Sequence, residues 1–240
     1  MNYAIILAGG VGNRLGAGIP KQFVEVLGKP IIAYTMQIYQ DHPEIDGIEL
    51  VCVDGFQDRL ARIAEDNHIT KVMKIVKGGS EYEKSIMNGV AGLDGIAKPD
   101  DVVMIHWAAA PFANAEIVSD NIRVCKEKGN AMSASPAYLL YGSNDGDCAR
   151  KNINRDTFRI LSAPQSFLYK NIVEIYRKVE EDNLLEKIEA HTTAIMTELG
   201  MPIYFSKGSQ TNIKITTKED IDMFTGYVLT QKYKSGELNI

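Results

Sequence analysis

The sequence has no apolar run that approaches the ~20 consecutive residues of a membrane-spanning helix. It also has no basic segment followed by a cleavable apolar stretch near Met1, where a strand is expected almost at once. Positive charge is not in excess, because the formal net charge is −5, and this balance gives no sign of a nucleic-acid or membrane-surface binder. We therefore expect a cytoplasmic protein with no nucleic-acid or membrane partner.

Cysteine is scarce as well. The three cysteines, Cys52, Cys125 and Cys148, are far apart in the sequence and do not have the spacing of metal ligands. We expect unpaired thiols in a reducing compartment. The cysteines therefore point to no metal site, and the ligands of any metal are left unknown at this stage.

What the chain does have is a length of 240 residues with 45% hydrophobic content, enough for one domain with a complete core. Short apolar segments alternate with amphipathic ones. This alternation predicts an α/β fold, a Rossmann-like, mostly parallel sheet with helices on both faces. The expected strands are 2–7, 48–53, 72–77, 102–106, 131–135 and 203–207, and the expected helices are 31–41, 57–67, 83–93, 115–128, 170–182 and one from Thr217.

Two local patterns refine this picture. The last helix is expected to start with a capping box, because Thr216 is followed three residues later by Glu219. The α/β rhythm breaks between Pro136 and Ser162, where the turn-rich segment 142–146 predicts a projecting hairpin. We see no repeat or linker, so we predict a single domain over residues 1–240 with a protruding β-arm at about 136–162.

The most informative segment is LAGGVGNRLGAGIPKQF, which runs from Leu7 to Phe23. Its glycines directly after a strand allow backbone N–H groups to approach a phosphate or a nucleotide. The dinucleotide fingerprint fails, because the position of its third glycine, counted from Gly10, is Leu15, and the P-loop pattern is also absent. A glycine-rich turn alone is weak evidence, so a plain turn is an open alternative.

Two cations bracket this loop. Arg14 and Lys21 lie within it, and Pro20 stiffens the backbone before Lys21. Fixed cations near the α-phosphorus of a nucleoside triphosphate stabilise the transition state more than the ground state. The alternative is a pair of solvated surface cations, but the combination of glycines and cations favours a triphosphate site.

This loop resembles the signature of the pyrimidine nucleotidyltransferases that make CDP-alcohols. That family has two branches, the 2-C-methyl-D-erythritol 4-phosphate and the ribitol 5-phosphate cytidylyltransferases. The resemblance continues in order along nearly the whole chain, through Gly78-Gly79…Ser85, HWAAAPF at 106–112, Ala163-Pro164-Gln165 and 212–216. It implies one nucleotidyltransferase domain, CTP with Mg²⁺ as the nucleotide substrate, a small alcohol phosphate or phosphonate as acceptor, and a homodimer built by the arm.

The resemblance also assigns roles to residues. Arg14 and Lys21 would grip the triphosphate, Lys214 at the end of a short strand would face the α-phosphate or the acceptor, and Ala108 would offer its N–H to the ribose. Arg155 on the arm would reach the acceptor phosphate of the partner subunit. In full, the catalytic residues would be Arg14, Lys21 and Lys214, the nucleotide-binding residues Ala8, Gly9, Gly10, Gly79, Ser80, Ser85 and Ala108, and the acceptor-binding residues Trp107, Arg155 and Thr192.

The sequence departs from the family pattern mainly on the acceptor side. Trp107 stands where the family turn has an acid, Ala110 where it has an arginine, and Tyr82 where an arginine follows Gly-Gly. Trp107 either covers an apolar or cationic part of the acceptor or only packs the turn. Two further readings stay open, a catalytically degenerate nucleotide-binding regulatory protein and, disfavoured by Leu15, an NAD(P) oxidoreductase.

Overall fold

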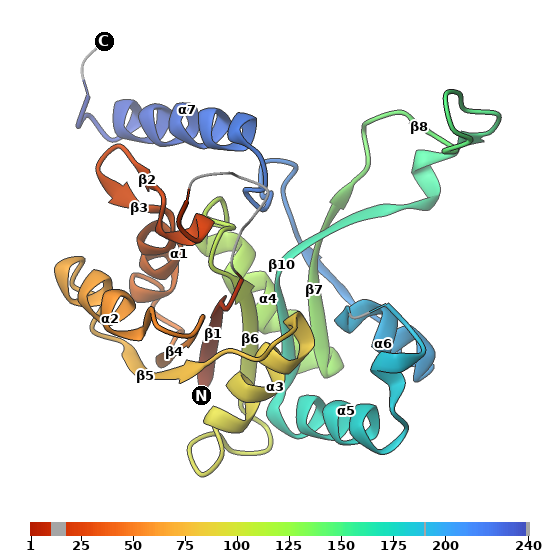
Figure 1. The fold of residues 1–240 in the computed structure, drawn as a ribbon, viewed down its shortest axis with the longest axis horizontal. Helices are drawn as coiled ribbons and strands as arrows, with labels where there is room; N and C mark the ends of the chain where they lie inside the picture. The colour runs from red at the N-terminus through yellow and green to blue at the C-terminus, as the bar shows by residue number, and fades with distance from the viewer. Residues whose placement is uncertain (11–17, 190, 239–240) are drawn as a thin grey trace.

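The computed structural model describes residues 1–10, 18–189 and 191–238. Its centre is a seven-stranded sheet in the order β11-β7-β10-β6-β1-β4-β5 (Figure 1). The strands of this sheet are β1 (Asn2–Ala8), β4 (Gly47–Cys52), β5 (Val72–Lys77), β6 (Val102–Trp107), β7 (Asn130–Pro136), β10 (Arg159–Leu168) and β11 (Phe205–Lys207).

The sheet is mostly parallel, as predicted, with one exception. β1 pairs in parallel with β4 on one side and β6 on the other, so the strand order reverses at β1. β10 was not predicted and runs antiparallel to both of its neighbours. Its sequence RILSAPQSFL hides the strand, because Pro164 and several polar residues lower strand propensity. The register shift between Ser162 and Gln165 accommodates the proline within the sheet.

Helices cover both faces of the sheet. One face packs against α1 (Ile31–Gln40), α2 (Gln57–Asp66) and α4 (Ala115–Lys128), and the other against α3 (Tyr82–Gly92), α5 (Tyr169–Glu181) and α6 (Thr192–Glu198). Neighbouring residues of β1 point to opposite cores, and both Ile5 and Ile6 are fully buried. A strand buried on both faces reads as one continuous apolar run, which is why it was recognised from the sequence.

The C-terminal helix α7 (Lys218–Lys234) closes over the turn that follows β6. Its Phe224 and Val228 pack with Ala109 and Phe112 of that turn. The predicted capping box exists one residue later than expected, because Thr217 and Asp220, not Thr216 and Glu219, cap the helix. Shorter elements complete this part of the chain, namely η2 (Lys21–Phe23), β2 (Glu25–Val26), β3 (Lys29–Pro30) and, before α6, η4 (Leu184–Glu186).

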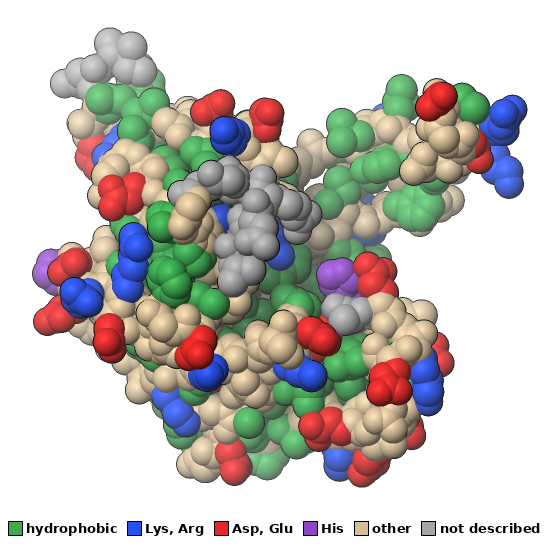
Figure 2. Space-filling view, viewed as in Figure 1, with side chains coloured by type: hydrophobic (Ala, Val, Ile, Leu, Met, Phe, Trp, Pro, Cys, Tyr) green, Lys and Arg blue, Asp and Glu red, His purple; other side chains and the backbone are tan. Residues whose placement is uncertain are grey.

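The segment after β7 leaves the body as a projecting arm, as predicted (Figure 1). It contains β8 (Tyr141–Gly142), β9 (Asn152–Ile153) and η3 (Arg155–Thr157). Figure 2 shows hydrophobic and basic side chains along it. The exposed apolar side chains are Tyr138, Leu139, Leu140, Phe158 and Leu161. Assembly through the arm stays a prediction.

Two expectations from composition can be compared with the structure. The three cysteines are unpaired, with Cys52 and Cys125 buried and Cys148 exposed on the arm. Across the residues that the structure describes, no helix combines the length and apolarity needed to cross a bilayer.

Candidate active site

A cavity of about 730 Å³ opens at the carboxyl ends of the strands around β1. In open α/β sheets this switch point, where the strand order reverses, is the usual place for a ligand. The cavity is formed by the chain segments that follow β1, β4, β5 and β6. Its lining includes Gly9, Gly10, Lys21, Gln22, Asp54, Lys77, Gly78, Gly79, Ser80, Glu81, Tyr82, Ser85, Trp107, Ala108, Ala109, Lys214 and Thr216.

The start of the glycine loop is held by a residue that sequence reasoning missed. The buried Gln22 donates from Nε2 to the carbonyl oxygens of Ala8 at 2.8 Å and Gly10 at 2.9 Å. Ala8 itself is buried within the sheet and does not line the cavity. Gln22 follows Lys21 directly, so the same short helix that fixes the loop also presents the lysine.

Lys21 reaches the cavity from the first residue of η2. Its Nζ donates to the carbonyl oxygen of Ile215 at 2.7 Å. The contact joins two segments almost two hundred residues apart in the sequence, and Lys214 and Thr216 on either side of Ile215 line the same cavity. Arg14, the other predicted cation of the loop, lies outside the described residues.

The loop between β5 and α3 forms the opposite edge with mostly backbone groups. Gly79 donates its N–H to Ser85 Oγ at 3.0 Å, and this hydroxyl donates to the carbonyl oxygen of Glu81 at 3.0 Å. A hydroxyl has one proton and two acceptor positions, so Ser85, which lines the cavity, keeps one acceptor position beyond these two bonds. A Cβ at Gly79 would lie 2.3 Å from Lys84 Cβ, so only glycine fits this path.

The HWAAAPF turn is fixed by a buried histidine. His106 Nδ1 lies 2.7 Å from the Tyr39 hydroxyl, and Nε2 lies 2.9 Å from the carbonyl oxygen of Ala110. Burial lowers the pKa of His106 to about 4, so the imidazole is neutral at physiological pH. Its role is to hold the turn, because it does not line the cavity.

Ala108 lines the cavity as predicted, but its N–H is committed elsewhere. The group donates to the carbonyl oxygen of Leu7 at 3.0 Å, and the Ala108 carbonyl accepts from Thr35 Oγ1 at 2.8 Å. These bonds tie the turn to β1 and α1. Contrary to the expectation, the Ala108 N–H is therefore already bonded within the protein and does not face a ribose. The neighbouring Ala109 also lines the cavity.

Trp107 and Tyr82 form one wall of the cavity. The indole N–H of Trp107 donates to the Tyr82 hydroxyl at 2.9 Å, and Gln165 also hydrogen-bonds this hydroxyl. Burial raises the pKa of Tyr82, so its side chain stays a neutral phenol. The two residues that depart from the family pattern noted in the sequence therefore hydrogen-bond to each other.

Behind this wall lies a buried polar chain. Gln165 Nε2 donates to Thr192 Oγ1 at 3.1 Å, Thr192 contacts the Tyr176 hydroxyl, and Tyr176 donates to Glu83 Oε2. Burial raises the pKa of Glu83 to about 7. Thr192, predicted to bind the acceptor, is thus buried behind the wall and does not line the cavity.

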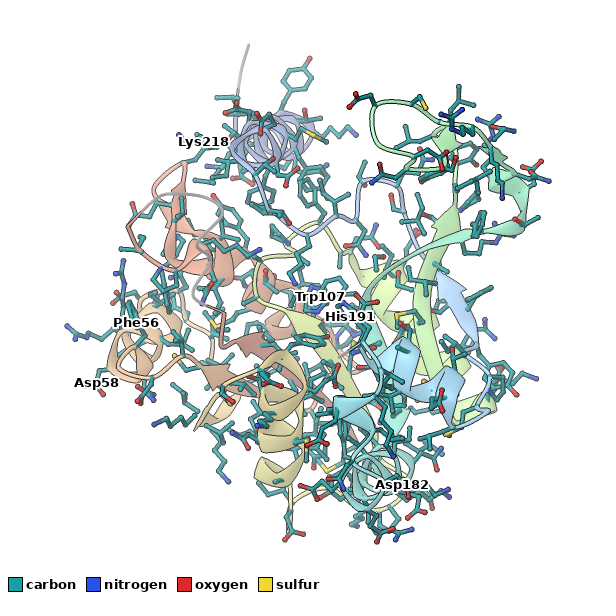
Figure 3. All side chains as sticks on the ribbon, turned by 45° about the vertical axis from the view of Figure 1, so that its right-hand side comes forward. Phe56, Asp58, Trp107, Asp182, His191 and Lys218 are labelled. Carbon is teal, nitrogen blue, oxygen red and sulfur yellow. The ribbon has the colours of Figure 1, made fainter. Side chains whose placement is uncertain are left out.

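Lys214 contacts both rings of this wall. The sequence predicts Lys214 at the end of a short strand, but it lies in an irregular segment. This segment is anchored by the hydrogen bond from the Ile215 N–H to the Ala109 carbonyl oxygen at 2.8 Å. The Lys214 Nζ is 4.7 Å from the centroid of the Trp107 ring and 6.0 Å from that of Tyr82. Figure 3 labels Trp107 and His191 near the centre of the molecule, and the ring centroids of His191 and Tyr82 are 5.9 Å apart.

Arg155 is not part of this cavity within its own chain. It lies on the arm, where its Nη1 donates to the carbonyl oxygen of Tyr138 at 2.6 Å. The structure therefore brings together most of the predicted residues but leaves Ala8 and Thr192 behind the surface and Arg155 on the projecting arm.

Carboxylates are few in the described lining. Asp54 Oδ2 pairs with Lys77 Nζ at 2.8 Å, and Glu81 is the other acidic side chain there. Across the part of the chain that the structure describes, no three His, Cys, Asp or Glu residues group as metal ligands. Lys21 and Lys214 instead make this site suited to an anion.

Comparison with known proteins agrees with this geometry. The model of the family described as IspD, 2-C-methyl-D-erythritol 4-phosphate cytidylyltransferase, matches residues 2–230. The chain belongs to this family.

Relatives within the IspD family carry two activity names. A ribitol-5-phosphate cytidylyltransferase from Lacticaseibacillus paracasei is 38% identical over 94% of this chain and 97% of its own. A 2-C-methyl-D-erythritol 4-phosphate cytidylyltransferase from Clostridium botulinum is 35% identical over 92% of this chain and 94% of its own. The solved Francisella tularensis IspD structure matches with a TM-score of 0.77 at 26% identity, covering 94% of this chain and 98% of that one. The fold and the enzyme class predicted from the sequence are thereby confirmed.

Proposed function

We propose that the protein transfers CMP from CTP to a small sugar alcohol phosphate, with a CDP-alcohol and pyrophosphate as products. The observation that carries this proposal is the switch-point cavity, where glycine-lined strand exits meet Lys21 and Lys214. Family membership supports the same reaction. The relatives named for ribitol 5-phosphate and for methylerythritol phosphate both use an alditol phosphate, and either a phosphate or a related phosphonate suits the chemistry.

The reaction needs positioning and charge neutralisation more than a strong base. A phosphate oxygen of the acceptor attacks the α-phosphorus of CTP, the new P–O bond forms, and the bond to the β-phosphate oxygen breaks. The attacking oxygen is already anionic, so no side chain has to remove a proton. In our proposal Lys21, Lys214 and Arg14 offset the charge that gathers on the phosphates.

Mg²⁺ belongs to this proposal as part of the nucleotide substrate. The described lining offers only Asp54, which is paired with Lys77, and Glu81 as carboxylates. Mg²⁺ keeps several waters and is commonly held by phosphate oxygens with few protein ligands. We therefore propose that the ion arrives with CTP and is held chiefly by its phosphates.

The loop between β5 and α3 is proposed to read the cytosine base. Ser85 Oγ gives its proton to Glu81 and so offers a lone pair, which suits the 4-amino group of cytosine. Uracil presents a carbonyl at that position and would leave the site unmatched, which costs about 1–3 kcal/mol in a desolvated pocket. Gly79 and Ser80 would supply backbone groups beside it.

We further propose a cytoplasmic homodimer with a composite active site. The arm carries exposed apolar side chains, and apolar patches of this kind mark association surfaces. Arg155 lies on that arm, outside the cavity of its own chain. In a two-fold dimer it would reach the acceptor phosphate in the partner's cavity.

The test is pyrophosphate release from CTP and Mg²⁺ with a panel of acceptors. The panel holds ribitol, methylerythritol and glycerol phosphates together with aminoalkyl phosphates and phosphonates. We expect strong stimulation by at least one alditol phosphate. Binding of CTP without acceptor-dependent pyrophosphate release would instead support the regulatory protein that binds nucleotide without transferring it.

A further inference from the structure

The wall of the cavity holds a cation of the protein itself. Lys214 Nζ lies over the Trp107 ring at 4.7 Å and near the Tyr82 ring at 6.0 Å from the centroids. An ammonium within about 6 Å of a ring centroid is attracted by the negative face of the ring, most strongly for indole. One interpretation of the sequence has Trp107 cover a cationic part of the acceptor, but a second cation beside Lys214 would be repelled.

The two rings are held in place by the elements behind them. The hydrogen bond from Trp107 Nε1 to the Tyr82 hydroxyl joins the turn after β6 to the first residue of α3. Through Gln165 and Thr192 the chain of hydrogen bonds continues into β10 and α6. Side chains whose polar groups are bonded on several sides have little freedom to turn.

We propose that Trp107 and Tyr82 are positioning residues that hold the Lys214 ammonium for the phosphates. The catalytic part of this inference rests on the proposed function. The resemblance places an acid and an arginine at these two positions, and a carboxylate beside Lys214 would cancel part of its charge. A ring face orients an ammonium and leaves its full charge for the transition state.

Spectroscopy provides the first test, because Trp107 is the single tryptophan of the chain. Its emission in the protein without nucleotide should change in Lys214→Met, which removes the charge over the ring, and change less in Lys214→Arg. Tyr82→Phe should also shift the emission, because the indole N–H loses its acceptor. Lys126→Met, on the exposed end of α4, is the matched control and should leave the emission unchanged.

Kinetics provide the second test. Trp107→Leu should lower kcat for pyrophosphate release by roughly 2- to 30-fold, the range that a cation–π contact represents, while the Kd for CTP stays unchanged. The same substitution in a Lys214→Met background should cause little further loss, because the residue that Trp107 positions is already absent. Trp107→Phe, which keeps a ring, should recover part of the loss and also serves if the leucine variant does not fold.

The outcomes separate the two proposals. If Lys214→Met leaves the emission as in Lys126→Met, or if Trp107→Leu costs the same factor in both backgrounds, Trp107 does not act through Lys214 and the inference is wrong. If the wild type releases no pyrophosphate with any acceptor, the proposed function fails. The emission of the Lys214 variants then still decides whether the rings hold the lysine.

Discussion

On one side of the cavity, the exits of β1 and β5 present backbone at Gly9 and Gly79, next to the small side chain of Ser85 in α3. On the other, the turn after β6 and the start of α3 present the large rings of Trp107 and Tyr82. A backbone surface reads its ligand through groups that every residue has, and it tolerates only residues that leave the chain path unchanged. A side-chain wall can be rebuilt by paired substitutions, and here the two new rings bond to each other. The difference teaches that substitutions in the side-chain wall can change the surface offered to a ligand without moving the backbone on the other side.

The largest loss is expected for Lys21→Ala. Removing a charge expressed mainly in the transition state should lower turnover about 10²- to 10³-fold with the fold intact. Pyrophosphate release measures it, and Lys126→Ala on the outer end of α4 is the control. Turnover near that of the wild type would show that the backbone side needs no fixed cation from η2.

A loss of about 10- to 100-fold is expected for Arg155→Ala, since hydrogen bonds between charged groups are worth about 1.5–3 kcal/mol. Equal mixing of this variant with Lys21→Ala, after subunit exchange, should restore about a quarter of the wild-type sites, because half of the dimers are mixed and each has one complete site. Native mass spectrometry proves the exchange. No recovery after proven exchange would place Arg155 outside the partner's site.

Gly79→Ala tests the backbone side directly. The new Cβ would collide with Lys84, so the loop must move and the bond from the Gly79 N–H to Ser85 Oγ is strained. We expect CTP affinity to fall about tenfold, the cost of one good buried hydrogen bond, as measured by calorimetry. Gly226→Ala on α7, where a Cβ meets nothing within 4 Å, should bind CTP normally. Equal affinity in both variants would mean that the loop adapts freely.

Trp107→Asp tests the side-chain wall. The wild type should use methylerythritol phosphate poorly, because its hydroxyls meet rings at positions where the family pattern has an acid and an arginine, at about 1–3 kcal/mol for each unpaired group. The aspartate of the variant should raise the rate with this hydroxyl-rich acceptor about tenfold relative to the other acceptors, while CTP binding is unchanged. The acceptor panel measures both proteins side by side. Methylerythritol phosphate as the best wild-type substrate would mean that Trp107 does not select against this acceptor.

The smallest effect on turnover is expected for Glu83→Gln, behind the wall. Burial raises the Glu83 pKa from 4.5 to about 7, so the folded state binds this proton more tightly than the unfolded state. The resulting stability is present at low pH and is lost as pH rises from about 4.5 to 7, at most about 3 kcal/mol. The glutamine variant should therefore melt higher than the wild type at about pH 8 and similarly near pH 5.

Glu49→Gln is the matched control for this pH effect. Glu49 is also buried with a pKa raised to about 7, but it lies on β4, away from the cavity lining. Both glutamine variants should flatten the slope of melting temperature against pH, whereas only Glu83→Gln should alter the emission of Trp107. An unchanged slope in Glu83→Gln would mean that this carboxyl is not held neutral by the fold.

Much of the fold followed from local pattern. β1 and β6 read as apolar runs because both of their faces are buried, and α4 carries its own start and stop in Asn114 and Gly129. β10 could not be predicted from local pattern, because its serines and glutamine hydrogen-bond to residues elsewhere in the chain, such as Ser166 to Asn121. No property of the strand itself reveals a partner more than forty residues away.

The sequence by itself determined the alternation of strands and helices, the glycine exit of β1 and the place of Lys21 behind it, because each depends on residues adjacent in the chain and their backbone preferences. Only the tertiary structure decided that Gln22 holds the loop, that the Ala108 N–H donates to the Leu7 carbonyl and that Lys214 lies over Trp107. These contacts join segments whose separation in the sequence carries no signal. They form only when the sheet and α7 have packed, because burial is what makes a hydrogen bond or a ring face worth more than its contact with water.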